Sequence, residues 1–211
     1  MAEQSTSSAI GHFSLRARFL LRKASYLWAP RAASWLRKQW VILRNPQATI
    51  RFEGPVYLGP GFSLYMPDGG TFVVGPGVEF RRGFRAEIAA GGEVRIGAGC
   101  HFTFDPLIRC ATSVTFGDEC MVGQASVISD GGNSSRLGGV PRPLKIANGA
   151  VITSKCTVLD NLGDRAWIGA NTVVSEPIPA YSVAGGVPAR VLDYFGPEPE
   201  AQPEVVSGVR S

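Results

Sequence analysis

Side chains that could carry acid–base or metal chemistry are scarce in this sequence. It contains only two histidines, His12 and His101, and four cysteines, none of which belongs to a Cys-x-x-Cys pair. A zinc ribbon needs such pairs, and a catalytic zinc site needs three protein ligands, so we expect no metal centre. Cys100 and Cys120 occupy the same place in two related short segments, which favours burial in a core.

Polar residues gather in one long irregular segment. It runs from Ser129 to Pro143 and reads SDGGNSSRLGGVPRP, which contains too many Gly, Pro and Asn residues for a regular strand. An irregular excursion from a regular scaffold commonly carries binding or catalytic residues. We therefore expect the functional site at this segment.

A repeat of six residues surrounds the irregular segment. A large apolar residue is followed by Gly or Ala, by two small or polar residues, and by a short strand. Each hexad supplies one flat strand and one turn, with its first residue and its small fifth residue directed inward. Three hexads make a triangular coil of about eighteen residues, with some unevenness around that length, and coils stack by parallel pairing. Hexads run in register from six positions: Phe116, Val122, Ile128, Ile146, Ile152 and Val158.

The repeat predicts an all-β solenoid over residues 47–195. A Pro-rich piece after Val174 ends the coils, and a short cap follows it. Residues 1–46 form a basic amphipathic helical arm, and residues 196–211, rich in Pro and Glu, are expected to be disordered.

The arm combines basic and aromatic residues. Eight Lys and Arg residues but no acidic residue fall within residues 12–44, and Pro30 divides this stretch into two helices. Leu36, Trp40 and Leu43 share one face of the second helix. Two interpretations remain open: residues 12–44 lie in an anionic membrane interface, or the arm packs on the domain or on a neighbouring subunit.

Charge and composition narrow the location and the partners. The formal net charge of +4 comes from the arm, so the body offers no basic face and we expect no nucleic-acid partner. No secretory signal and no run of eighteen apolar residues occur. A cytoplasmic protein is expected, at the inner face of the membrane if the arm binds lipid.

The hexads, the irregular segment and the closing Gly186-Val-Pro-Ala-Arg190 together resemble the hexapeptide-repeat acyltransferases. The resemblance covers about residues 56–195 and is nearest to the maltose, galactoside and antibiotic acetyltransferases and to sugar O-acetyltransferases. It implies a left-handed parallel β-helix and a homotrimer, with acetyl-CoA or another acyl-CoA in grooves between subunits. The acyl group would pass to a hydroxyl or amine of a sugar or glycolipid.

In that family a histidine near the start of the loop takes the proton of the acceptor. The matching stretch here reads ISDGGN, and the resemblance puts Asn133 in the histidine position, although Gly131 or Gly132 could also match it. Asparagine cannot accept a proton near neutral pH. Asp130 or His101 is then a candidate substitute base. Substrate-assisted transfer and an inactive protein also remain open.

The resemblance also implies cofactor contacts. The matching positions are Asn148 and Ala170 beside the pantetheine arm, Ser175 near the adenosine end, and Arg190 at the CoA phosphates. Two lysines are further candidates for the phosphates: Lys145 and Lys155.

A non-catalytic trimer that binds a ligand through the same groove is the competing interpretation, and the missing histidine favours it. Zinc carbonic anhydrases built on a similar β-helix need three histidines around each metal, so that class is excluded.

Overall fold

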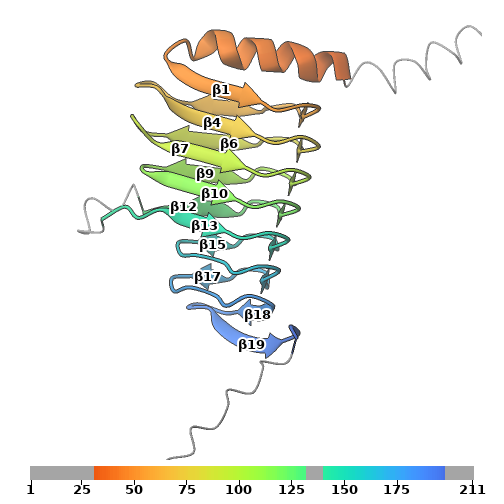
Figure 1. Ribbon diagram of the computed structural model, residues 1–211, viewed down its shortest axis with the longest axis vertical. Coiled ribbons are helices and arrows are strands. Elements are labelled where there is room, and N and C mark those ends of the chain that lie inside the picture. The colour runs from red at the N-terminus through yellow and green to blue at the C-terminus, as the bar shows by residue number, and fades with distance from the viewer. Residues whose placement is uncertain (1–30, 132–139, 198–211) are drawn as a thin grey trace, which may run out of the picture.

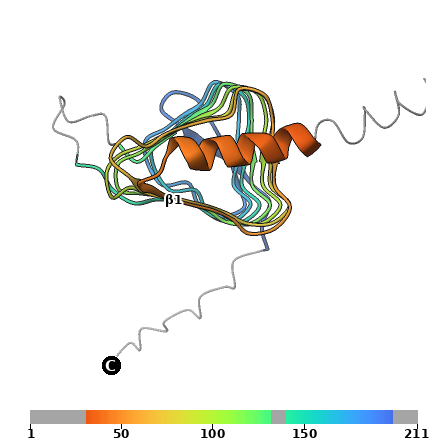
Figure 2. The ribbon, with the colours of Figure 1, turned by 90° about the horizontal axis from the view of Figure 1, so that it is seen from above.

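A computed structural model describes residues 31–131 and 140–197, which wind into a stack of triangular coils with three flat faces (Figures 1 and 2). Face A contains β1 (Ala48–Phe52), β4 (Gly70–Val74), β7 (Glu93–Ile96), β10 (Ser113–Phe116) and β13 (Leu144–Ile146). Face B contains β2 (Tyr57–Leu58), β5 (Glu79–Phe80), β8 (His101–Phe102), β11 (Met121–Val122), β14 (Val151–Ile152), β16 (Trp167–Ile168), β18 (Ser182–Gly185) and β19 (Arg190–Tyr194). Face C contains β3 (Ser63–Tyr65), β6 (Arg85–Ile88), β9 (Leu107–Cys110), β12 (Val127–Ser129), β15 (Thr157–Val158) and β17 (Val173–Val174).

The chain visits face A, face B and face C in turn, and each strand pairs in parallel with its equivalent in the next coil. Among the described strands only β18 and β19 pair antiparallel. This hairpin ends the stack and is the short cap that the sequence predicts.

The hexad pattern is confirmed where the sequence shows it in register. The first residue of each of the six hexads is at most 2% exposed. Four of the fifth residues that follow are small and buried: Cys120, Ser126, Ala150 and Cys156. The fifth residue of the Val158 hexad is the larger Leu162, which is also buried.

The coils depart from the predicted length of about eighteen residues by more than a little unevenness. Equivalent positions are 22 residues apart in the N-terminal coils, as Glu87 and Arg109 are. Asp118 and its equivalent Asn148 are 30 residues apart, because the irregular segment lies between them. Asn148 and Asp164, in the narrow C-terminal coils, are only 16 residues apart. The solenoid therefore narrows from its N-terminal to its C-terminal end, as Figure 1 shows.

The width of the coils decides what fills them. The N-terminal coils enclose a column of phenylalanines: Phe62, Phe72, Phe80, Phe84, Phe102 and Phe116. Successive rings in this column are in contact, with the centroids of Phe80 and Phe102 5.0 Å apart. The C-terminal coils contain only smaller buried residues: Ile146, Ala150, Ile152, Cys156, Val158, Leu162, Ala166, Ile168 and Val174.

The turns of the coils need a left-handed backbone at the residue before the buried small one. Gly99 supplies it in one coil, with φ of 66°. The equivalent turn of the next coil uses Glu119, with φ of 57°. A turn between faces B and C uses Lys155, with φ of 58°. A side chain in this conformation costs about 1–2 kcal/mol relative to glycine.

A helix over residues 31–44 lies across the open N-terminal end of the first coil (Figures 1 and 2). Ser34 Oγ accepts a hydrogen bond of 2.8 Å from Leu58 N, and Arg37 donates one of 2.8 Å to Leu58 O. Val41 joins the core. The inner side of this helix thus packs on the domain, whereas Leu36, with Trp40 and Leu43, faces away and is exposed.

No helix within the described residues is long and apolar enough to cross a membrane.

Candidate functional site

The irregular segment leaves the solenoid at the edge where face C turns into face A, called the loop edge below. It follows β12, and its neck is closed by a hydrogen bond of 3.1 Å from Arg142 N to Asp130 O. Residues 132–139 lie outside the described residues. Asn133 and Gly132 are therefore not placed, and Gly131 is half-buried at the neck.

The Asp130 side chain is 3% exposed and points into the coil before the loop. Both of its oxygens accept hydrogen bonds from Ala111 N at 2.9 Å. Its Oδ2 also accepts from Thr112 N at 2.6 Å, from Thr112 Oγ1 at 2.9 Å and from Ser113 N at 3.2 Å. A carboxylate engaged by this many donors fixes the neck against the corner beneath it, so the geometry favours an anchoring role over proton transfer.

A pocket of about 340 Å³ opens at the loop edge on the N-terminal side of the neck. Its walls include Tyr65, Glu87 and Arg109, together with the corner residue Ala111 that Asp130 holds. Arg109 Nε donates to Glu87 Oε2 at 3.0 Å, and each side chain is about two-fifths exposed. Tyr65 is 65% exposed. This edge pocket therefore offers a carboxylate, a guanidinium and an aromatic face to one ligand.

The residues of the edge pocket stand in one row because the coils place them in register. Tyr65 pairs with Glu87, and Glu87 pairs with Arg109. Sequence reasoning missed this set because it used a coil of eighteen residues, whereas Glu87 and Arg109 are 22 residues apart. A search for polar residues at that longer period would have found them.

The C-terminal half of the loop edge carries the remaining charged groups. Arg142 lies 3.5 Å from Asp160, one coil past the neck. Ser175 is exposed at the same edge one coil further on. Arg190, 3.9 Å from Glu176, has a side chain that is 66% exposed. Ser175 and Arg190 are thus brought together at the far end of the edge that carries the loop.

The other two proposed cofactor residues lie on different edges. Asn148 is exposed at the edge between faces A and B, where its Oδ1 accepts from Asp118 N at 2.9 Å. Its own N donates to Asp164 Oδ1 at 3.0 Å, so it belongs to a ladder that links successive turns. Ala170 is exposed at the edge between faces B and C. Within one chain, neither residue lies beside Ser175.

His101 and the two candidate lysines also lie away from the neck. His101 points outward from face B, as expected, and its Nδ1 is 3.5 Å from Glu79 Oε2. Lys145 is exposed on face A, and Lys155 is exposed in a turn between faces B and C.

The cysteines are all free and buried, in agreement with the predicted core role. Burial, aided by the nearby Asp130 carboxylate, raises the pKa of the Cys110 thiol to about 12. A hydrogen bond with Cys120, together with burial, raises the pKa of Cys100. Neither thiol is a nucleophile at neutral pH. In the part of the chain that is described, no group of three or more His, Cys, Asp or Glu residues could hold a metal.

Comparisons with known proteins agree with this architecture. A scan against protein families finds no matching family model. A serine acetyltransferase of Haemophilus influenzae is 34% identical over 87 residues, which are 39% of this chain and 32% of the relative. The chain thus spans about a third of that relative's length.

Two solved structures share the fold. A hexapeptide-repeat acetyltransferase of Vibrio cholerae, solved with acetyl coenzyme A, superposes with a TM-score of 0.50 at 18% identity, over 76% of this chain and 79% of the other. A hexapeptide transferase family protein of Anaplasma phagocytophilum superposes with a TM-score of 0.51 at 10% identity. The superposition covers 72% of this chain and 87% of the other.

The fold is therefore the left-handed parallel β-helix of the hexapeptide-repeat acetyltransferases. The partial sequence match supports the resemblance to these acyltransferases. None of the three proteins is described as a maltose or galactoside acetyltransferase.

Proposed function

We propose that this protein is a CoA-dependent acyltransferase. It moves an acyl group, acetyl in the simplest case, from acyl-CoA to a hydroxyl or amine of a sugar or glycolipid, as in the maltose, galactoside and sugar O-acetyltransferase branch. The loop edge supports this most directly. It aligns a polar and aromatic pocket, the neck of a long loop, and a basic end at Arg190 on one side of the solenoid.

The acceptor lies in the edge pocket in this proposal. Glu87 accepts a hydrogen bond from one sugar hydroxyl, Arg109 donates to another, and the exposed Tyr65 ring covers the apolar side of the sugar. Glu87 and Arg109 already form an ion pair of 3.0 Å, so both side chains are held in place before the ligand binds. Asp130 positions this wall because it holds Ala111.

The cofactor lies along the C-terminal half of the same edge, with its phosphates at Arg190 and its adenosine end near Ser175. Asn148 and Ala170, on the other two edges, contact the pantetheine arm from a neighbouring subunit. The acceptor oxygen attacks the thioester carbonyl, a C–O bond forms, and the C–S bond then breaks. The acceptor proton is transferred in the same sequence to the departing sulfur, which leaves as the CoA thiol.

Asn133 occupies the position of the family's histidine in this proposal. Its amide orients the acceptor hydroxyl but takes no proton, and a missing general base costs about 10²–10⁴ in rate. The change Asn133→His should therefore raise kcat, by up to about 10²–10⁴-fold. An unchanged kcat with intact CoA binding would contradict the placement.

A homotrimer completes the site. Face B carries an outward apolar row that runs from the loop-bearing coil into the narrow coils, formed by Met121, Val151, Trp167 and Val183 in register. In the single chain, Trp167 is 49% exposed and Met121 is 40% exposed. A neighbouring copy would cover this row and supply the cofactor contacts that lie on other edges. A glycolipid acceptor would place this trimer in the cytoplasm, at the inner face of the membrane.

Thiol release from acetyl-CoA, measured with a panel of mono- and oligosaccharides, tests the proposal. The double change Glu87→Gln and Arg109→Gln should raise the acceptor KM by at least about tenfold, because two hydrogen bonds to charged groups are lost. The matched control is Glu93→Gln with Arg95→Gln, an exposed ion pair of 2.6 Å on face A. Equal effects of the two double changes would contradict the acceptor site.

A trimer that binds CoA or another ligand without turnover is the alternative. The one described histidine, His101, lies on face B and away from the neck, where it is not placed to act as a base. This position favours the alternative without turnover. Calorimetric titration with acetyl-CoA separates the cases: binding without thiol release for any acceptor supports the alternative.

A further inference from the structure

The helix over residues 31–44 has two faces that are unlike each other. Its inner face caps the first coil through Ser34, Arg37 and Val41. Its outer face presents large apolar side chains to solvent: Trp35 at 60% exposure, Leu36 at 60%, Trp40 at 60%, Ile42 at 43% and Leu43 at 74%. A patch of this kind on a rigid element commonly marks an interaction surface. The helix lies across the end of the stack (Figure 1). Because Ser34, Arg37 and Val41 contact the first coil, the exposed apolar patch lies on the side of the helix away from that contact.

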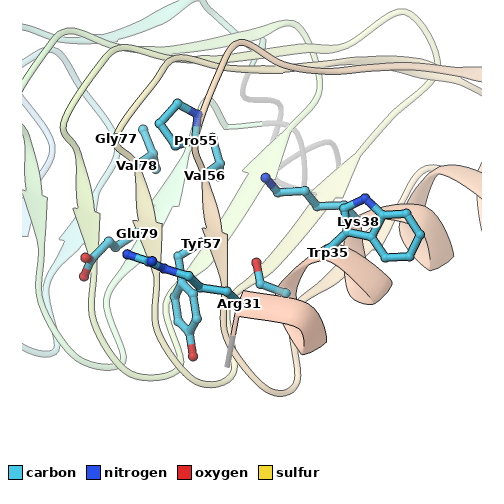
Figure 3. Close-up of a pocket in the computed structure, with 10 residues that line it drawn as sticks. Arg31, Trp35, Lys38, Pro55, Val56, Tyr57, Gly77, Val78 and Glu79 are labelled. Atoms are coloured by element: carbon cyan, nitrogen blue, oxygen red, sulfur yellow. The ribbon is translucent and has the colours of Figure 1, made fainter. Parts of the chain in front are cut away.

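Beside this patch, a pocket of about 380 Å³ separates the helix from the turns of the first two coils (Figure 3). Arg31 and Lys38 reach into it from the helix, and Trp35 and Tyr57 line it. Lys38 Nζ lies 5.3 Å from the centre of the Phe52 ring. Partial burial lowers the pKa of Lys38, so an anion in the pocket would stabilise its charged form.

One carboxylate also lines this pocket, that of Glu79. Arg81 already lies 3.7 Å from this carboxylate, and His101 Nδ1 lies 3.5 Å from it. The helix itself contributes basic residues alone, because residues 31–52 include no Asp or Glu. The charge of the pocket and its rim therefore complements an anion.

We propose that this end of the solenoid docks on an anionic phospholipid surface. The outer apolar patch of the helix lies at the level of the headgroups and upper acyl chains, and Arg31 and Lys38 bind lipid phosphates in the adjoining pocket. Aromatic and aliphatic side chains beside Arg and Lys are the combination that interfacial helices use. The proposal deepens the membrane location given above and needs no acyl transfer by the site.

Flotation of the full chain with vesicles tests this docking. The chain should float with phosphatidylcholine vesicles that contain phosphatidylglycerol and much less with phosphatidylcholine alone. The double change Trp40→Glu and Leu43→Glu should lower partitioning by at least about 100-fold, because two apolar side chains no longer leave water. Its matched control is Val191→Glu with Leu192→Glu on β19, at the opposite end of the stack, where the side chains are 49% and 69% exposed.

The pocket is tested in the same way. Arg31→Gln with Lys38→Gln should lower partitioning by about 30-fold, at roughly fivefold for each basic residue near an anionic surface. Arg82→Gln with Arg95→Gln, on the solenoid body, is the control and should leave flotation unchanged.

Three results would overturn the docking: no flotation of the unchanged chain, flotation that survives Trp40→Glu with Leu43→Glu, or an altered oligomeric state of that variant without vesicles. The last result would identify a second copy as the occupant. Circular dichroism of each variant checks the fold. Thiol release with a soluble acceptor should be unaffected by the helix variants, so failure of docking and failure of acyl transfer are distinguishable.

Discussion

The wide N-terminal coils and the narrow C-terminal coils follow one backbone plan but fill it differently. Coils of 22 residues enclose phenylalanine rings, whereas coils of 16 residues enclose aliphatic side chains with alanines and a cysteine. Face A changes most between the two regions. It has five-residue strands at β1 and β4, but only single bridges where Ile146, Leu162 and Ile178 pair. Coil length and side-chain volume are therefore matched.

The functional features change at the same boundary. The edge pocket belongs to the wide coils, and the proposed cofactor end belongs to the narrow coils. The long coil that carries the loop joins them. The difference between the regions thus fits a site with two ends.

Exchanging core residues between the regions should have the largest effect. Phe102 and Ile152 occupy equivalent places on face B, one coil to each side of Val122. We expect Ile152→Phe to lower the free energy of unfolding by about 3 kcal/mol, because a narrow coil has no space for a ring. Phe102→Ile should cost about 2 kcal/mol by leaving a cavity. Urea unfolding measures both, and tolerance of Ile152→Phe would show that coil width does not set the core.

Substitution at the loop neck, between the two regions, should have the next largest effect on stability. Asp130→Ala leaves the donors of residues 111–113 without their carboxylate, so we expect a loss of about 2–3 kcal/mol and a higher acceptor KM. The control is Asp118→Ala, an exposed acceptor for Ala98 N at 2.7 Å, which should cost about 1 kcal/mol and leave KM unchanged. Denaturation and steady-state kinetics together provide the measurement, and equal KM values would argue against a positioning role for Asp130.

Substitutions at the left-handed turn residues should change stability in opposite directions in the two regions. Gly99→Ala should lower stability by about 1 kcal/mol, because alanine is strained at φ of 66°. Lys155→Gly should raise it by about 0.5 kcal/mol, since relief of strain outweighs the added freedom of the unfolded chain. Thermal melting of the two variants is sufficient, and a shift in the same direction for both would refute the assignment of these turns.

The last prediction concerns alkaline pH, because its effect on stability is absent at neutral pH. The Cys110 pKa is raised to about 12 in the folded chain, above its ordinary value of 9.0. The unfolded thiol therefore loses its proton first, and the stability that Cys110 contributes is complete below pH 9.0 and declines between there and about 12. Unfolding of the parent chain and of Cys110→Ala across this range should show a shallower decline in the variant. Parallel curves would mean that Cys110 does not titrate as described.

The sequence predicted the solenoid well where the hexads are regular and poorly where they are not. Phe116, Val122 and Ile128 start hexads of six residues, and their burial follows directly from that period. Around Phe72 and Phe80 the strands and corners are longer, so no hexad period is visible and the coil length was underestimated. Large phenylalanines at inward positions were the signal of wider coils.

The candidate site was predicted only in part for a similar reason. The irregular segment indicated the loop edge, and Arg190 proved to lie at the far end of that edge. The row of Tyr65, Glu87 and Arg109 depends on the length of the wide coils, which local patterns do not give. Asp130 is a polar loop residue in sequence, and only the packing of the neighbouring corner shows that it points inward.

A crystal structure of the chain grown with CoA tests the central claim most directly. The account predicts CoA along the edge between faces C and A, with its phosphates at Arg190 and its thiol end directed to the loop neck beside Asp130. CoA bound along another edge, remote from Arg190 and from the neck in every subunit, would contradict it.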